Sequence, residues 1–135
     1  MIDRNWFTPT DPQLFFSRND AQDPRLGENV VSQFINTANE FCILGYPDDE
    51  GIIKNGGRPG ASQAPFEIRK YFYKMTPHVQ KPIKPQLYDL GNLNIQNISL
   101  LDRHDRARQS IRQLNENSKK WISLGGGHDY GYSDA

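Results

Sequence analysis

The stretch Trp121-Ile122-Ser123-Leu124-Gly125-Gly126-Gly127-His128-Asp129 decides the fold of this chain. Its first four residues form a short apolar run with the character of a buried strand, and three glycines follow directly. A strand that ends in this way carries the imidazole of His128 to the C-terminal edge of a sheet, where open α/β folds build their sites. Only six residues follow Asp129. We therefore expect a site to begin in this sequence and to need donors from elsewhere.

Two further strand-and-helix units precede this stretch. The apolar runs 41–46 and 87–91 each have the length and composition of a buried strand. A helix is predicted over 63–75, and a second one follows the capping residue Ser99 and ends at Asn117. The apolar face of the first helix consists of Pro65, Ile68, Phe72 and Met75. That of the second consists of Leu100, Leu101, His104, Ala107, Ile111 and Leu114.

The resulting order is strand, helix, strand, helix, strand. Connections of this length imply parallel strands joined by right-handed crossovers. Three strands and two helices leave sheet edges and faces that other elements must cover. We therefore expect residues 39–135 to be the N-terminal portion of an incomplete α/β domain.

Residues 1–38 are expected to form an arm that packs on this domain. They are polar and rich in turn-forming residues, and a helical turn or two is predicted within 29–36. The aromatic residues that anchor the arm are Trp6, Phe7, Phe15 and Phe16.

The composition argues against several classes of protein. The chain has 16 basic and 16 acidic residues, and this balance gives no sign of a surface for nucleic acid. The densest basic cluster is interleaved with Asp102 and Asp105 and is expected to be a solvated helix face; it consists of Arg103, Arg106, Arg108 and Arg112. No segment resembles a signal peptide or a membrane span, and the lone cysteine, Cys42, lies in an apolar run where it is expected to pack as a small hydrophobe. We expect a cytoplasmic protein that binds neither membranes nor nucleic acid.

The glycine motif around His128 allows more than one interpretation. A dinucleotide fingerprint fails because Tyr130 occupies the position of its third glycine, and the chain has no Gly-Lys pair for a P-loop. A plain glycine turn with an incidental histidine remains open. The alternative is a metal ligand, because neutral imidazole is a preferred donor for first-row cations. Such a site needs partners, and His78 and His104 are each expected to be structural.

Two loop segments are candidates to support this site. Asp48, Asp49 and Glu50 follow the first strand at the same sheet edge as His128, either as a solvated acidic turn or as the support of a pocket. Residues 47–61 are predicted to be loop. Within them, glycines surround Arg58, and the free N–H groups of the next helix suit an anion. A plain connecting loop would explain the same pattern, although long loops often carry function.

Five motifs in order resemble the N-terminal part of the ureohydrolase superfamily, which includes arginase, agmatinase and formimidoylglutamase. The motifs are Leu44-Gly45-Tyr46-Pro47-Asp48-Asp49-Glu50-Gly51, Asn55-Gly56-Gly57-Arg58-Pro59-Gly60-Ala61, Ala64-Pro65 with Ile68-Arg69, Asp89-Leu90-Gly91-Asn92, and Leu124-Gly125-Gly126-Gly127-His128. Arginases and agmatinases usually have Gly-Gly-Asp-His-Ser at the last motif. An acidic residue after the histidine, as Asp129 is here, is closer to formimidoylglutamases.

The resemblance implies a three-layer α/β/α fold with a mainly parallel sheet, of which only the first part is present. It also implies a centre of two Mn2+ ions with His128 as its first protein ligand, and hydrolysis of a C–N bond in a linear amidine or guanidine. The later family motifs that supply the other metal ligands, Asp-x-His-x-Asp and Asp-x-Asp, do not occur in these 135 residues. Asn55 and Arg58 match the family's loop near the pocket and are candidates for substrate binding.

Three functions remain open at this stage. The first is the N-terminal portion of a formimidoylglutamase, which releases formamide and glutamate from N-formimidoylglutamate during histidine breakdown. The second is a guanidino-hydrolase that releases urea, and the third is a truncated, non-catalytic interaction module. We expect this chain alone to be inactive and to need the missing C-terminal part, or a homo-oligomer partner, besides its small-molecule substrate.

Overall fold

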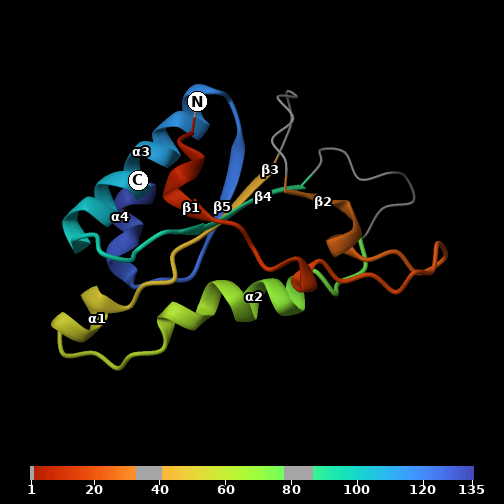
Figure 1. Ribbon diagram of the computed structural model, residues 1–135, viewed down its shortest axis with the longest axis horizontal. Helices are drawn as coiled ribbons and strands as arrows, with labels where there is room; N and C mark the ends of the chain where they lie inside the picture. The colour runs from red at the N-terminus through yellow and green to blue at the C-terminus, as the bar shows by residue number, and fades with distance from the viewer. Residues whose placement is uncertain (1, 33–40, 78–86) are drawn as a thin grey trace.

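Three parallel strands form the centre of the molecule. The computed structural model describes residues 2–32, 41–77 and 87–135 (Figure 1). Strands β3 (Phe41–Gly45), β4 (Leu87–Leu93) and β5 (Lys120–Leu124) lie in the order β4-β3-β5. Both neighbouring pairs are parallel, which confirms the prediction from the order of elements.

The N-terminal arm adds two short strands to the free side of β4. Strand β1 (Phe7–Thr8) pairs antiparallel with the C-terminal end of β4, and β2 (Val30–Val31) pairs parallel with its N-terminal end. The prediction of a helical turn or two in 29–36 is therefore wrong for Val30 and Val31, while Asn29 is the last residue of a 3-10 helix. Residues 33–36 lie outside the described residues. Residues 2–32 of the arm also contain three 3-10 helices: η1 (Arg4–Trp6), η2 (Pro12–Leu14) and η3 (Leu26–Asn29).

Helix α3 (Leu100–Glu116) covers one face of the sheet together with the short α4 (Gly131–Asp134) (Figure 1). Ser99 caps α3 by accepting from the amide of Asp102, and Asn117 follows its last turn, as predicted. The core on this face is formed by Cys42, Leu44, Tyr88, Leu90, Ala107, Ile111 and Leu114, among others. The expected apolar stripe is thus confirmed in its C-terminal half. Leu101 is an exception, because 78% of it is exposed.

Helix α2 (Ala64–Phe72) lies on the opposite face, so the sheet has helices on both sides (Figure 1). The predicted apolar face is confirmed for Pro65, which is buried, and for Phe72, which packs against the core. It is wrong for Ile68 and Met75, which are exposed, while Arg69 and Tyr73 are buried. The spacing of the apolar residues was right for a helix, but it did not reveal that a charged side chain faces the sheet. The helix also ends at Phe72, earlier than the predicted limit of 75.

Arg69 is buried because Asp89 of β4 neutralises it. Its Nε and Nη2 atoms donate to the two carboxylate oxygens of Asp89, each at 2.8 Å. Asp89 also accepts from the hydroxyl of Tyr73 and from the amide of Gly91. A bidentate pair of this kind is geometrically specific, so it fixes the register of α2 on the sheet.

The connections before α2 and the strand β5 differ from expectation. Within 47–61, predicted to be loop, a short helix α1 (Glu50–Lys54) and the start of the 3-10 helix η4 (Ala61–Gln63) are present. Strand β5 is not fully buried, since Ile122 is 43% exposed. In the described part of the chain β5 pairs with β3 only, so it is an edge strand. Among the described helices, none has the length and apolar character needed to cross a bilayer.

Candidate functional site

Two turns meet at the C-terminal edge of the sheet. One follows β3 and contains Asp48, and the other follows β5 and contains Gly127. The amide of Gly127 donates to the carbonyl oxygen of Asp48 at 2.9 Å, and that of Tyr46 donates to the carbonyl of Leu124 at 3.0 Å. The expectation that these turns share one edge agrees with this arrangement.

The glycines before His128 are required by the backbone. Gly125 and Gly126 have φ angles of +70° and +83°, in the left-handed region that favours glycine. A Cβ atom at Gly126 would also lie 2.9 Å from the carbonyl oxygen of Tyr46. The chain therefore turns sharply after β5, and the 3-10 helix η5 (His128–Tyr130) starts at His128.

His128 is exposed at this edge. Its imidazole is accessible to a cation, as a metal ligand must be. In the described residues, no three His, Cys, Asp or Glu side chains come together to form a metal site. Metal binding at His128 therefore remains a prediction that needs further donors.

Asp48 is the buried acidic residue beneath this turn. Its carboxylate accepts from the hydroxyl of Tyr130 at 2.5 Å, from Nη1 of Arg103 at 3.1 Å and from the amide of Glu50 at 3.0 Å. Burial works to raise the pKa of Asp48, but these hydrogen bonds outweigh it and hold the pKa below its usual value. The interpretation of 48–50 as a solvated acidic turn is thus wrong for Asp48, which is buried and holds Tyr130 and Arg103 in place next to the turn that carries His128.

Arg103 joins this support from helix α3. Its Nη1 atom donates to Asp48 and also to Glu50, the latter at 2.6 Å. Burial works to lower the pKa of Arg103, and the two carboxylates outweigh it and raise the pKa. The expectation of a solvated face is therefore wrong at Arg103. Sequence alone missed it because its partners lie more than fifty positions away in the chain.

Asp129 and Tyr130, directly after His128, are held by aromatic and polar contacts. Nε2 of His104 donates to Oδ2 of Asp129 at 2.5 Å. The ring of Tyr130 stacks on Tyr46 with centroids 4.5 Å apart, and the ring of His104 lies perpendicular to the Tyr130 ring with centroids 4.8 Å apart. The sequence offered Tyr130 only as the residue that breaks a glycine fingerprint, so this role was missed.

The two candidate substrate-binding residues lie in the loop after α1. Asn55 is the C-cap of α1, and its backbone N–H donates to the carbonyl oxygens of Gly51 and Ile52. Arg58 is exposed, and the loop is closed where the amide of Gly60 donates to the carboxylate of Asp49 at 2.8 Å. A contact of Asn55 or Arg58 with substrate stays a prediction.

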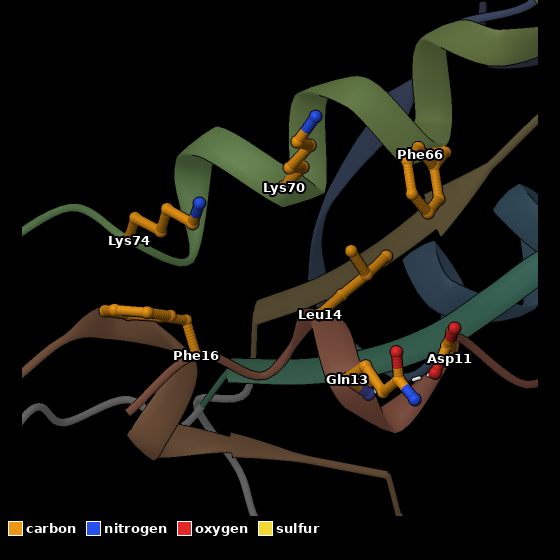
Figure 2. A pocket seen from close by; sticks show the side chains of 7 residues that line it. All are labelled: Asp11, Gln13, Leu14, Phe16, Phe66, Lys70 and Lys74. Carbon is orange, nitrogen blue, oxygen red and sulfur yellow. Dashed lines mark hydrogen bonds between the residues drawn. The ribbon is translucent and has the colours of Figure 1, made fainter. Parts of the chain in front are cut away.

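A hollow of about 270 Å³ lies elsewhere, between the N-terminal arm and the outer flank of α2. Figure 2 shows the rings of Phe16 and Phe66 with Leu14 around it, while the Lys70 side chain extends away from the arm. The ammonium group of Lys70 lies near Glu67 and the ring of Tyr71 instead. This hollow involves none of the residues at the sheet edge around His128.

Comparisons of the sequence and of the structure with known proteins agree on one family. A sequence model of the Arginase family matches residues 39–134. The curated formimidoylglutamase of Aeromonas hydrophila is 29% identical over 132 residues, which cover 93% of this chain and 41% of the relative. A Trypanosoma cruzi formiminoglutamase variant, solved with Mn2+, superposes with a TM-score of 0.70 at 26% identity, over 84% of this chain and 39% of that one.

A Bacillus subtilis formimidoylglutamase has a TM-score of 0.74 at 21% identity, over 88% of this chain and 38% of its own, and so supports the fold alone. The chain spans well under half the length of each of these relatives.

Proposed function

Because the chain belongs to the arginase family, we propose that it forms the amino-terminal part of a manganese-dependent formimidoylglutamase. The complete enzyme hydrolyses N-formimidoyl-L-glutamate to L-glutamate and formamide. The observation that carries the proposal is the exposed His128 at the C-terminal edge of a parallel sheet, in a chain whose relatives are formimidoylglutamases. One of the similar structures was solved with Mn2+.

The residues at this edge fit part of a manganese site. His128 is a suitable donor because it is exposed and sits on a backbone that contacts hold on both sides. Asp48 and Asp129 do not serve as further donors here, since Tyr130 and Arg103 engage the first and His104 engages the second. When bound, Mn2+ ions lower the pKa of water and stabilise the negative charge that develops on the attacked group. This chain contributes one ligand and the scaffold, and the other ligands come from the part that its relatives have in addition.

The sheet has a surface for that additional part. Ile122 of β5 and Ile43 of β3 are register partners, so both point to the face that α2 covers. On α2, Phe66 lines the hollow beside the arm, and the other flank leaves Ile68 and Tyr71 exposed. Met75, which follows the helix, is exposed as well. We propose that the remaining polypeptide of the arginase fold docks along β5 and this flank.

The proposal is tested by assaying hydrolysis with Mn2+ present. Residues 1–135 are produced alone, and also together with the C-terminal 60% or so of the Aeromonas relative, the share that its 41% coverage leaves over. We expect no turnover by the chain alone and release of formamide from N-formimidoyl-L-glutamate by the pair, abolished by His128→Asn. Turnover by 1–135 alone would refute the proposal. Urea release from arginine or agmatine, without formamide release, would assign a guanidino-hydrolase instead.

A further inference from the structure

His104 contacts the segment after His128 in three ways. Its Nε2 donates to Asp129, its ring packs perpendicular to that of Tyr130, and its carbonyl oxygen accepts from the hydroxyl of Ser133 at 3.1 Å. His104 lies in the first half of α3, a helix that the core residues Ala107, Ile111 and Leu114 fix to the sheet. Because His104 is part of this fixed helix, its three contacts hold residues 129–133 in place relative to the sheet.

The surroundings of Asp129 are shaped to keep its carboxylate in this place. A Cβ atom at Gly51 would lie 2.7 Å from the carboxylate carbon of Asp129, and one at Gly127 would clash with a carboxylate oxygen. Both positions are glycine, so the side chain fits between α1 and the turn. His104 and Asp129 are each about three-quarters buried, which limits exchange of their hydrogen bond with water.

We propose that His104 is a positioning residue for His128, acting through Asp129 and Tyr130. Fixing the two residues that follow His128 sets the direction in which its imidazole leaves the sheet edge. On the other side, the amide of Gly127 is held by the carbonyl oxygen of Asp48. His128 is thus clamped from both neighbours while remaining exposed itself. We call these contacts on both sides of His128 the clamp. Its effect on metal binding rests on the function proposed above, whereas the clamp itself does not depend on that function.

The clamp is tested by backbone 15N relaxation on the full 135-residue chain. We expect an order parameter at His128 typical of rigid backbone, about 0.85, and a value below about 0.6 in His104→Ala. His104→Gln keeps an N–H donor within reach of Asp129 and is expected to restore most of the order. The matched control is Asp105→Asn, the next residue of α3, whose carboxylate pairs with Arg108 and Gln109 instead.

Three results would overturn the clamp: a mobile His128 in the unsubstituted chain, an unchanged order parameter in His104→Ala, or no difference between His104→Gln and His104→Ala. If His104→Ala does not fold, as judged from the amide signals of β3 and β4, Asp129→Asn removes the charge from the same hydrogen bond. We then expect a smaller loss of order at His128, and no loss would count against the clamp.

A second measurement separates the clamp from the proposed function. In the active pair of polypeptides, ligand-supporting residues typically contribute about 10–100-fold to metal affinity. We expect His104→Ala to weaken Mn2+ binding by such a factor in equilibrium dialysis, and His104→Gln to recover it. If the order parameters change as expected and the Mn2+ affinity does not, His104 still positions the turn, but His128 is not the ligand.

Discussion

At the scale of single residues, buried charges paired across the chain hold the site and the sheet together. Asp48 links the turn after β3 to Tyr130 and to α3, while Arg69 links α2 to β4. Breaking such pairs leaves an uncompensated charge and is costly, whereas replacing both partners often is not. These contacts are local in space and remote in sequence, so hydrophobic patterning could not predict them.

Asp48→Asn is expected to lower the free energy of unfolding at neutral pH by about 2–3 kcal/mol, because hydrogen bonds to a charged group are lost. Folding lowers the pKa of Asp48 below its usual 3.8, so the ionised carboxylate stabilises the fold above that pH. This contribution is lost as the pH falls through the lower pKa of the folded state. Urea unfolding of both proteins from pH 7 to pH 3 should show the difference shrinking only below about pH 4. A difference that grows on acidification would contradict this account of Asp48.

Arg69→Met is expected to destabilise the protein by about 3–5 kcal/mol, since Asp89 is left buried without its counter-charge. The double variant Arg69→Met with Asp89→Leu should be more stable than the single variant, because it removes the orphaned carboxylate. Urea unfolding of the two single variants and the double variant measures the coupling between the residues. Simple additivity of the two substitutions would show that the pair does not act as a unit.

At the scale of elements, the strand-helix order was predictable and the two strands of the arm were not. The three apolar runs and their connections predicted the parallel pairing of β3, β4 and β5, although not their order in the sheet, and Ser99 and Asn117 marked the ends of α3 correctly. Strands of two residues, such as β1 and β2, carry too little periodic signal to be recognised. They form because β4 offers them an open edge.

Gly91 in β4 shows why the arm can reach that edge. Its φ is +93°, and a Cβ atom there would press on the backbone of Thr8 in β1. We expect Gly91→Ala to cost about 1–3 kcal/mol through this backbone strain and to speed amide exchange in β1. Gly131→Ala is the matched control, since its added methyl meets nothing within 4 Å. Equal exchange of β1 amides in both variants would show that close approach at Gly91 does not govern the pairing.

At the scale of the whole molecule, the two edges of the sheet differ: the strands of the arm pair with β4 on one side, and β5 is the edge strand on the other. The arm closes the side of β4, whereas in the described residues β5 has one neighbour, β3. The resemblance in sequence predicted the three-layer fold and the family. It could not predict that Ile68 and Tyr71 of α2 are exposed, because they have the same helical spacing as a core face.

The edge strand β5, with Ile122, and the exposed flank of α2, with Ile68 and Tyr71, form what we call the open surface. It is expected to make the isolated chain self-associate, because exposed apolar patches and unpaired edge strands favour contact between molecules. Ile68→Gln combined with Ile122→Lys should reduce the association, as seen in sedimentation velocity over a range of concentrations. Leu101→Gln removes an equally apolar exposed residue from α3, outside the open surface, and should leave association unchanged. An equal effect of both sets of substitutions would indicate nonspecific association that does not depend on the open surface.

The central claim is that His128 is a metal ligand at the edge of the sheet, and titration of the 135-residue chain with Mn2+ tests it most directly. Paramagnetic broadening of the ring signals of the three histidines reports which imidazole the ion approaches. The account predicts that His128 broadens first, and that His128→Asn abolishes broadening of the neighbouring Gly127 and Asp129 amides. Broadening that begins at His78 or His104, or that persists around position 128 in His128→Asn, would contradict it.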